Sequence, residues 1–145
     1  MRPIAASEDA PRPKGGPPFL RLTSWPYRAE MAAATLAILA LFVWRGLYVG
    51  DLDVAATVFW FLWPDLAAFV PIGAAMARGR AWPSWGSRLY NAFHTFLVWG
   101  PVFLIWSYVA GGMVWPLLGW AMHITMDRTV GYYLRAQMEG AVSRK

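Results

Sequence analysis

The chain has 145 residues, of which 58% are hydrophobic and 14% are charged, and it carries a net charge of +5. Soluble domains are about 45–50% apolar and about 25% charged, so this composition excludes a disordered chain, a repeat solenoid and an ordinary soluble enzyme, and leaves a single-domain membrane protein. The chain has no cysteine, which excludes disulfides, thiolate metal sites and cysteine nucleophiles.

Residues 1–28 are predicted to form an extended, solvated tail rich in proline and arginine. The segment PRPKGGPP at residues 11–18 cannot continue a helix, because proline lacks the backbone N–H and the paired glycines are flexible. On a soluble protein its cations would suggest an arm for nucleic acid. Next to apolar spans we expect instead a cytoplasmic tail that faces anionic lipid headgroups, with no nucleic-acid partner.

Four apolar stretches follow the tail and are predicted to be transmembrane helices. A run of about 20 residues crosses about 30 Å of hydrocarbon at 1.5 Å per residue. The first run is too long for the apolar core of a signal peptide, so we expect it to be retained. The predicted spans, within a membrane domain of residues 29–135, are residues 29–49, 54–77, 88–109 and 113–134, and residues 136–145 are a short polar C-terminal end.

The cations of the chain predict how these spans are oriented. Of the 13 arginine and lysine residues, only Arg45 lies on the side opposite to the two termini. Positively charged loops stay in the cytoplasm, so both termini are predicted to be cytoplasmic. We therefore expect an all-α membrane protein, built as an antiparallel four-helix transmembrane bundle. The cations on the cytoplasmic side are Arg2, Arg12, Lys14, Arg21, Arg28, Arg78, Arg80, Arg88, Arg128, Arg135, Arg144 and Lys145.

Few ionisable side chains lie inside the spans. An Asp at the centre of a membrane helix costs about 2.5–3.5 kcal/mol, so such groups normally face the helix bundle and have a partner. His123 and Asp127 are four residues apart and share one helix face. The rise of a helix places His94 at a depth similar to that of Asp127, in the cytoplasmic half of the bundle. The polar site predicted there consists of Asp65, His94, His123, Asp127 and Arg128.

Three interpretations are compatible with this polar site. The first is a hydrogen-bonded network that fixes the register of the helices. The second is a catalytic or metal site, in which a His acts as base, Arg128 holds an anionic group and the divalent metal is Zn, Fe or Mn. Its catalytic candidates are His94, His123, Asp127 and Arg128, and its metal-ligand candidates are Asp65, His94, His123 and Asp127. In the third, His94 or His123 is an axial ligand of haem or of a chlorophyll pigment.

Three motifs carry a resemblance to a known family, and they are PDL at residues 64–66, YNAFHT at residues 90–95 and HITMDRTVGY at residues 123–132. In this order they resemble a family of small bacterial integral membrane proteins called domain of unknown function 4260. The resemblance extends from about the first span to Arg135 and leaves out the proline-rich tail. It implies a compact four-helix membrane protein whose polar motif residues act as a unit, and it implies no reaction.

These observations predict a small multi-pass protein of the bacterial inner membrane, with an intramembrane His/Asp site on the cytoplasmic side. The site would support metal-assisted chemistry or ligand binding, and the sequence leaves open whether the protein is an enzyme. The alternative is a non-catalytic accessory or assembly subunit of a larger respiratory or photosynthetic complex. Such a subunit would contact its partners, pigment or lipid through the N-terminal tail and an aromatic surface, since 17% of the residues are Phe, Trp or Tyr.

Overall fold

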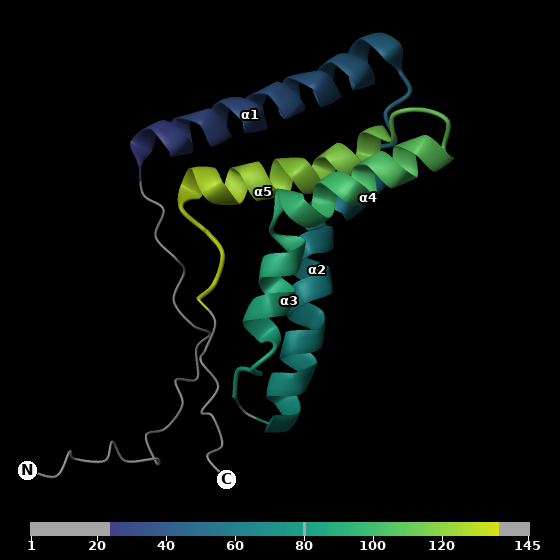
Figure 1. Cartoon of the computed structure of the whole chain (residues 1–145). Coiled ribbons are helices and arrows are strands. Elements are labelled where there is room, and N and C mark those ends of the chain that lie inside the picture. Colours follow the sequence, from purple (N-terminus) through teal and green to yellow (C-terminus); the bar gives the residue numbers. More distant parts are fainter. Residues whose placement is uncertain (1–23, 80, 137–145) are drawn as a thin grey trace, which may run out of the picture.

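The computed structural model describes residues 24–79 and 81–136 (Figure 1). The predicted tail therefore lies outside the described residues up to residue 23, as does the C-terminal end from residue 137. Every regular element of the described part is a helix. The elements are α1 (Trp25–Trp44), the π-helical turn η1 (Arg45–Val49), α2 (Val54–Gly79), α3 (Gly86–Phe93), α4 (Phe96–Val109), the 3-10 turn η2 (Trp115–Leu117) and α5 (Leu118–Val130).

Two of these helices are long and apolar enough to cross a membrane. Helix α1 continues into η1 to give 25 residues, and α2 has 26 residues. They match the first two predicted spans, except that α1 begins at Trp25, within the last four residues of the predicted extended tail, and α2 ends two residues later than predicted. The fold is therefore all-helical with two candidate membrane spans, as expected for the membrane class that the composition indicates.

The third predicted span, residues 88–109, is divided into α3 and α4, which bend by 51° relative to each other. The cause is local hydrogen bonding at the break. The His94 ring bonds back to the carbonyl of Tyr90, and Thr95 adopts an extended backbone (φ −128°, ψ 142°). The Thr95 hydroxyl then accepts a backbone N–H of the first turn of α4 and so caps that helix. Only as a broken pair do α3 and α4 reach the length of a span.

The fourth predicted span, residues 113–134, contains a shorter helix than expected. Pro116 lies in η2, and α5 begins only at Leu118. Gly131 ends α5 with a left-handed backbone (φ 99°), which glycine adopts without a steric penalty. Helix α5 has 13 residues, fewer than the about 20 that a membrane-spanning helix needs.

The helices form two groups (Figure 1). Helices α1 and α5 lie side by side, and α4 lies beside the beginning of α5, while α2 and α3 form a second pair that runs across the first group. Helix α5 joins the two groups, because it packs against both α1 and α2. The described part does not show the regular antiparallel four-helix bundle expected from the sequence, since the break before α4 and the crossing of α2 give the helices different directions.

The crossing of α2 and α5 depends on a glycine. A Cβ added to Gly119 would lie 2.5 Å from the backbone oxygen of Thr57 and 3.0 Å from the backbone nitrogen of Phe61. Only a residue without a side chain allows the two backbones to approach so closely. This contact places the following turn of α5, which carries His123, against the middle of α2, which carries Asp65.

Candidate metal centre

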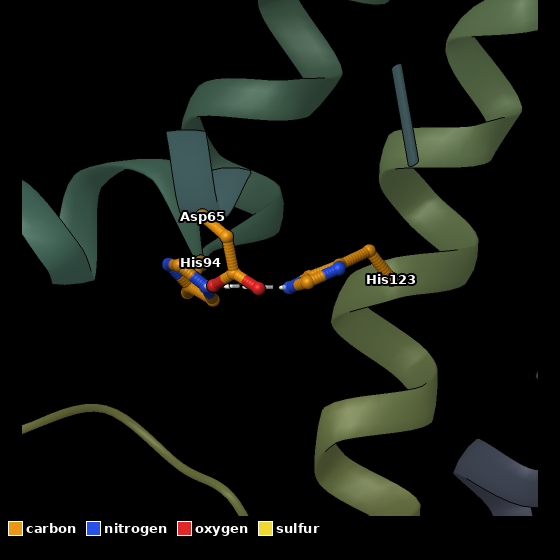
Figure 2. A group of neighbouring side chains, drawn as sticks. All are labelled: Asp65, His94 and His123. Atoms are coloured by element: carbon orange, nitrogen blue, oxygen red, sulfur yellow. Dashed lines mark hydrogen bonds and ion pairs between the residues drawn. The ribbon is translucent and has the colours of Figure 1, made fainter. Parts of the chain in front are cut away.

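The structure brings three of the predicted polar residues together (Figure 2). Asp65 comes from α2, His94 from the break between α3 and α4, and His123 from α5. The Asp65 carboxylate lies between the two imidazole rings, with Oδ1 at 3.3 Å from His94 Nε2 and 3.7 Å from His123 Nε2. The two Nε2 atoms are 3.3 Å apart. The predicted proximity of these three side chains is therefore confirmed.

Asp127 lies one turn after His123 on α5 and joins the same group. Its Oδ2 is 3.5 Å from His123 Nε2 and 3.8 Å from His94 Nε2. The spacing of four residues accounts for this, because side chains at i and i+4 of a helix are neighbours on one face. Asp65, His94 and His123 thus direct one ligand atom each toward a common point, and Asp127 lies beside the two imidazoles.

The orientation of His94 is set by its neighbours. Its Nδ1 lies 2.8 Å from the carbonyl oxygen of Tyr90, and since a carbonyl only accepts, Nδ1 carries the proton. The ring also stacks on the Tyr90 ring at 3.8 Å, and the Arg128 guanidinium donates to the His94 carbonyl at 2.8 Å. In neutral His94 the Nε2 atom therefore carries a lone pair that points into the group. Histidine ligands of metals are oriented in the same way, by a backbone carbonyl on the other ring nitrogen.

His123 is held mainly by ring packing. Its ring lies edge-on to the ring of Phe61, with the centroids 5.3 Å apart, and makes a similar contact with the His94 ring at 5.2 Å. Its Nδ1 is buried near the backbone of Phe61 without a well-formed hydrogen bond. The tautomer of His123 is consequently free to adjust to whatever its Nε2 meets in the group.

The distances within this group resemble those between ligands of one metal ion. With metal–ligand bonds of about 2.0–2.2 Å, two corners of a ligand tetrahedron are about 3.3–3.6 Å apart. The five N–N and N–O distances of the group are 3.3–3.8 Å. In neutral His94 the Nε2 lone pair faces the Asp65 carboxylate oxygen and the Nε2 atom of His123, both at 3.3 Å. A divalent cation would bind this lone pair together with those of Asp65 and His123.

The same distances disfavour axial ligation of haem or a pigment, the third interpretation of the sequence. A tetrapyrrole needs the open space in front of the ligating nitrogen for its planar ring. In front of His94 Nε2 that space holds the Asp65 carboxylate and the His123 ring, both at 3.3 Å. In front of His123 Nε2 lie the His94 ring at 3.3 Å, the Asp127 carboxylate at 3.5 Å and the Asp65 carboxylate at 3.7 Å.

A cavity of about 290 Å³ lies next to the carboxylates of the group. The histidines are buried, with the His94 side chain only 3% exposed, whereas 46% of the Asp65 side chain is exposed. A small molecule can therefore reach the group from its carboxylate side. The cavity is lined by Asp65, Phe69, Tyr90, Asp127, Tyr132 and Arg135.

The two arginines near the group have different positions. Arg128, expected from the sequence to hold an anion, is buried and contacts the His94 carbonyl and the ring of Tyr133. It therefore positions His94. Arg135 is the arginine that lines the cavity, although the sequence marks it only as one of the cytoplasmic cations. Burial lowers the pKa of the Arg135 guanidinium, and the neighbouring Tyr90 opposes this shift.

No family model matches the chain, and the searches of curated proteins and of solved structures found no similar protein. The resemblance to domain of unknown function 4260 therefore stays a prediction, and the function has to be inferred from the chemistry of the site.

Proposed function

We propose that this is a membrane protein in which Asp65, His94 and His123 hold a divalent metal that activates water for hydrolysis of an amphiphilic substrate. The observation that carries the proposal is the convergence of two imidazole nitrogens and two carboxylates at 3.3–3.8 Å. Nitrogen and oxygen donors without thiolate suit Zn, Fe or Mn. The backbone bond that holds Nδ1 of His94 supports the same assignment.

Asp65, His94 and His123 would supply three ligands, the number that catalytic zinc sites take from the protein while water holds the fourth position. Asp127 lies beside both imidazoles and also lines the cavity, so it is placed to act as the general base. In the proposed step a water oxygen attacks the carbonyl carbon or phosphorus of an ester, and its proton passes to Asp127. The bond to the leaving oxygen breaks, and that oxygen takes the proton from Asp127. An ion held by Asp65, His94 and His123 would lower the pKa of a bound water and polarise the ester oxygen.

The proposed location is the bacterial inner membrane, with four crossings and both termini in the cytoplasm. Helices α1 and α2 supply two crossings, the bent pair α3–α4 a third, and α5 with its flanking residues the fourth. The support is the distribution of the cations over the loops. The polar group would then lie at the break of the third crossing, and broken helices are tolerated in a membrane where they line a polar cavity. Membership of the family that the motifs resemble is part of the same proposal.

Metal analysis tests the proposal directly. The full chain, purified in mild detergent and supplied with Zn²⁺, Fe²⁺ or Mn²⁺, is expected to retain about one ion per chain. His94→Ala and His123→Ala should each weaken metal binding at least 100-fold, because each removes a ligand. Asp127→Asn should retain the ion, since it removes the base rather than one of the three ligands. Elemental analysis after gel filtration, with titration calorimetry for the affinity, measures all four proteins.

Asp53→Asn is the matched control for the carboxylate change. Asp53 is exposed and accepts the N–H of Ala56 at the start of α2, a capping role that Asn retains. This variant should bind metal as the unchanged protein does. Absence of stoichiometric metal in the unchanged protein after loading with all three ions would overturn the proposal. The polar group would then be a structural network, as expected of the alternative, a non-catalytic subunit of a larger complex.

A further inference from the structure

Arg135 lines the cavity together with the carboxylates of Asp65 and Asp127 and lies in the segment that follows α5. The segment after α5 turns back at Gly131 and is tied to α3 by a pair of hydrogen bonds. The Asn91 side chain donates to the Arg135 carbonyl at 2.9 Å and accepts the Arg135 N–H at 2.7 Å. Because both backbone groups of Arg135 are held by one side chain, its guanidinium starts from a defined place at the cavity.

Three aromatic rings surround this guanidinium. Its central carbon lies 4.9 Å from the ring centroid of Trp82, 5.1 Å from that of Tyr90 and 5.9 Å from that of Phe69. Contacts of this kind use the face of the guanidinium, and its N–H donors lie in the plane. The aromatic rings also exclude water, which strengthens an electrostatic interaction with an anion.

The same cavity carries the carboxylates of Asp65 and Asp127, which would repel an anion. A divalent cation held by Asp65, His94 and His123 beside Asp127 would offset that repulsion. It would also supply a second positive centre at the cavity that Arg135 lines. A phosphomonoester has three terminal oxygens, so it can give one to the cation and two to the paired N–H donors of Arg135, whereas a carboxylate has only two oxygens to divide between them. Arginine binds phosphate through two parallel N–H···O bonds.

We propose that this cavity binds the phosphate group of an amphiphilic phosphomonoester, with Arg135 as its anchor beside the metal. This inference rests on the proposed function, since the metal must be present for the anion to bind. The apolar part of the substrate would lie along α2, where Phe69 lines the cavity and its neighbours Leu66 and Val70 are exposed. Phosphate and metal binding are then coupled, and each strengthens the other by the same factor.

Phosphate titration of the full chain in phosphatidylcholine nanodiscs tests the inference. With Zn²⁺ bound, inorganic phosphate should bind at least 10-fold more tightly than after removal of the metal by a chelator. Arg135→Gln should lose at least 10-fold in phosphate affinity while it keeps the bound metal. Arg135→Lys keeps the charge without the paired donors and should lie between the two. Arg88→Gln, which changes an exposed arginine of α3, should bind phosphate as the unchanged protein does.

A second set of nanodiscs distinguishes a lipid headgroup from free phosphate. If the phosphate belongs to a lipid, phosphatidic acid in the disc should compete, and inorganic phosphate should bind several-fold more weakly than in phosphatidylcholine alone. If phosphate binding depends on Arg135 but phosphatidic acid does not weaken it, the proposal that the phosphate belongs to an amphiphilic substrate is wrong. Metal-dependent phosphate binding that Arg135→Gln and Arg135→Lys leave unchanged would overturn the inference and leave the metal centre intact. Absence of metal overturns both.

Discussion

Helices α4 and α5 are nearly equal in length, 14 and 13 residues, and have opposite relations to the interior. Helix α4 (FLVWGPVFLIWSYV) is almost entirely apolar, and none of its residues is buried. Helix α5 (LGWAMHITMDRTV) contains histidine, threonine, aspartate and arginine, and eight of its residues are buried. A membrane protein is expected to have apolar helices outside and polar helices inside, because lipid solvates apolar side chains and polar ones must find partners inside the protein.

The contacts of the two helices follow the same division. Helix α5 is linked to its surroundings by side-chain hydrogen bonds, such as Trp120 Nε1 to the Phe93 carbonyl at 2.7 Å and Arg128 to the His94 carbonyl at 2.8 Å. Helix α4 uses one side, with Trp99, Val102 and Phe103, to pack on the core, and its other side is open. Strong hydropathy in this chain thus indicates an outer helix, and the interior helix is marked by its polar groups.

The largest expected effect comes from truncating one aliphatic side chain of the same size in each helix. Ile124 of α5 is 0% exposed, and Leu104 of α4 is 67% exposed. Ile124→Ala should lower the free energy of unfolding by about 2–5 kcal/mol, because a cavity remains in a packed core. Leu104→Ala should change it by less than about 0.5 kcal/mol. Unfolding in mixed micelles with increasing dodecyl sulfate measures both, and equal losses would contradict the assignment of α4 to the outside.

The next effect comes from the contact between α5 and α2. Gly119→Ala places a Cβ 2.5 Å from the Thr57 carbonyl oxygen, and backbone atoms cannot yield as a flexible side chain can. Overpacking costs about 1–3 kcal/mol, and we expect a loss near the upper end. The shift of α5 should also separate His123 from Asp65 and weaken metal binding. Unfolding and metal titrations of the same preparation measure both consequences.

Gly73→Ala on α2 is the control for this change. A Cβ on Gly73 meets no atom within 4 Å, so alanine should stabilise the helix by about 0.5–1 kcal/mol. A Gly119→Ala protein with unchanged stability would show that α2 and α5 do not approach as closely as the structure has them.

Arg128 tests whether a polar contact of α5 also serves the site. Arg128→Met keeps the length of the side chain but leaves the buried His94 carbonyl without its charged donor, which should cost about 2 kcal/mol. Loss of a group that orients a metal ligand typically weakens binding about 10–100-fold. Arg88→Met, at an exposed arginine of α3, should change neither quantity. If Arg128→Met binds metal with unchanged affinity, Arg128 does not position His94 for metal binding.

Much of the candidate site could be predicted from the sequence. The spacing of His123 and Asp127 and the rise of a helix predict that the polar residues gather in one half of the bundle, with Asp65 and His123 about one to two turns deeper than His94. The structure brings Asp65, His94 and His123 together. The helical class followed from composition. The helical class rests on composition and the site on regular helix geometry, and both depend little on tertiary contacts.

The departures from regular geometry could not be predicted in this way. Hydropathy averaged over residues 88–109 gives one span, although the polar pair His94 and Thr95 lies at the break after α3, where the His94 ring bonds to the Tyr90 carbonyl. Arg135 comes to the cavity only because the chain reverses at Gly131 and Asn91, 44 residues away in sequence, holds its backbone. Hydropathy could not identify α5 as the interior helix, since its burial follows from its polar partners.

The smallest expected effect concerns the hydrogen bond between α5 and α1. Thr35 Oγ1 lies 2.8 Å from Thr125 Oγ1 and 2.9 Å from the carbonyl of Met31, and its single proton serves only one of them. Thr125 donates to the carbonyl of Met122, so Thr35→Val leaves it with a partner. The variant should therefore lose only about 0.6 kcal/mol, the average for such bonds between membrane helices.

The same unfolding titration measures this change, with Thr129→Val as its control. Thr129 donates to the Thr125 carbonyl within α5, so its hydroxyl contributes nothing to the contact with α1. If Thr35→Val lowers the free energy of unfolding by more than about 2 kcal/mol, the hydrogen bond between Thr35 and Thr125, rather than packing, is the main contact between α1 and α5. The polar character of α5 would then extend from the site to its whole length, and the contrast with α4 would be sharper than the burial of the two helices already makes it.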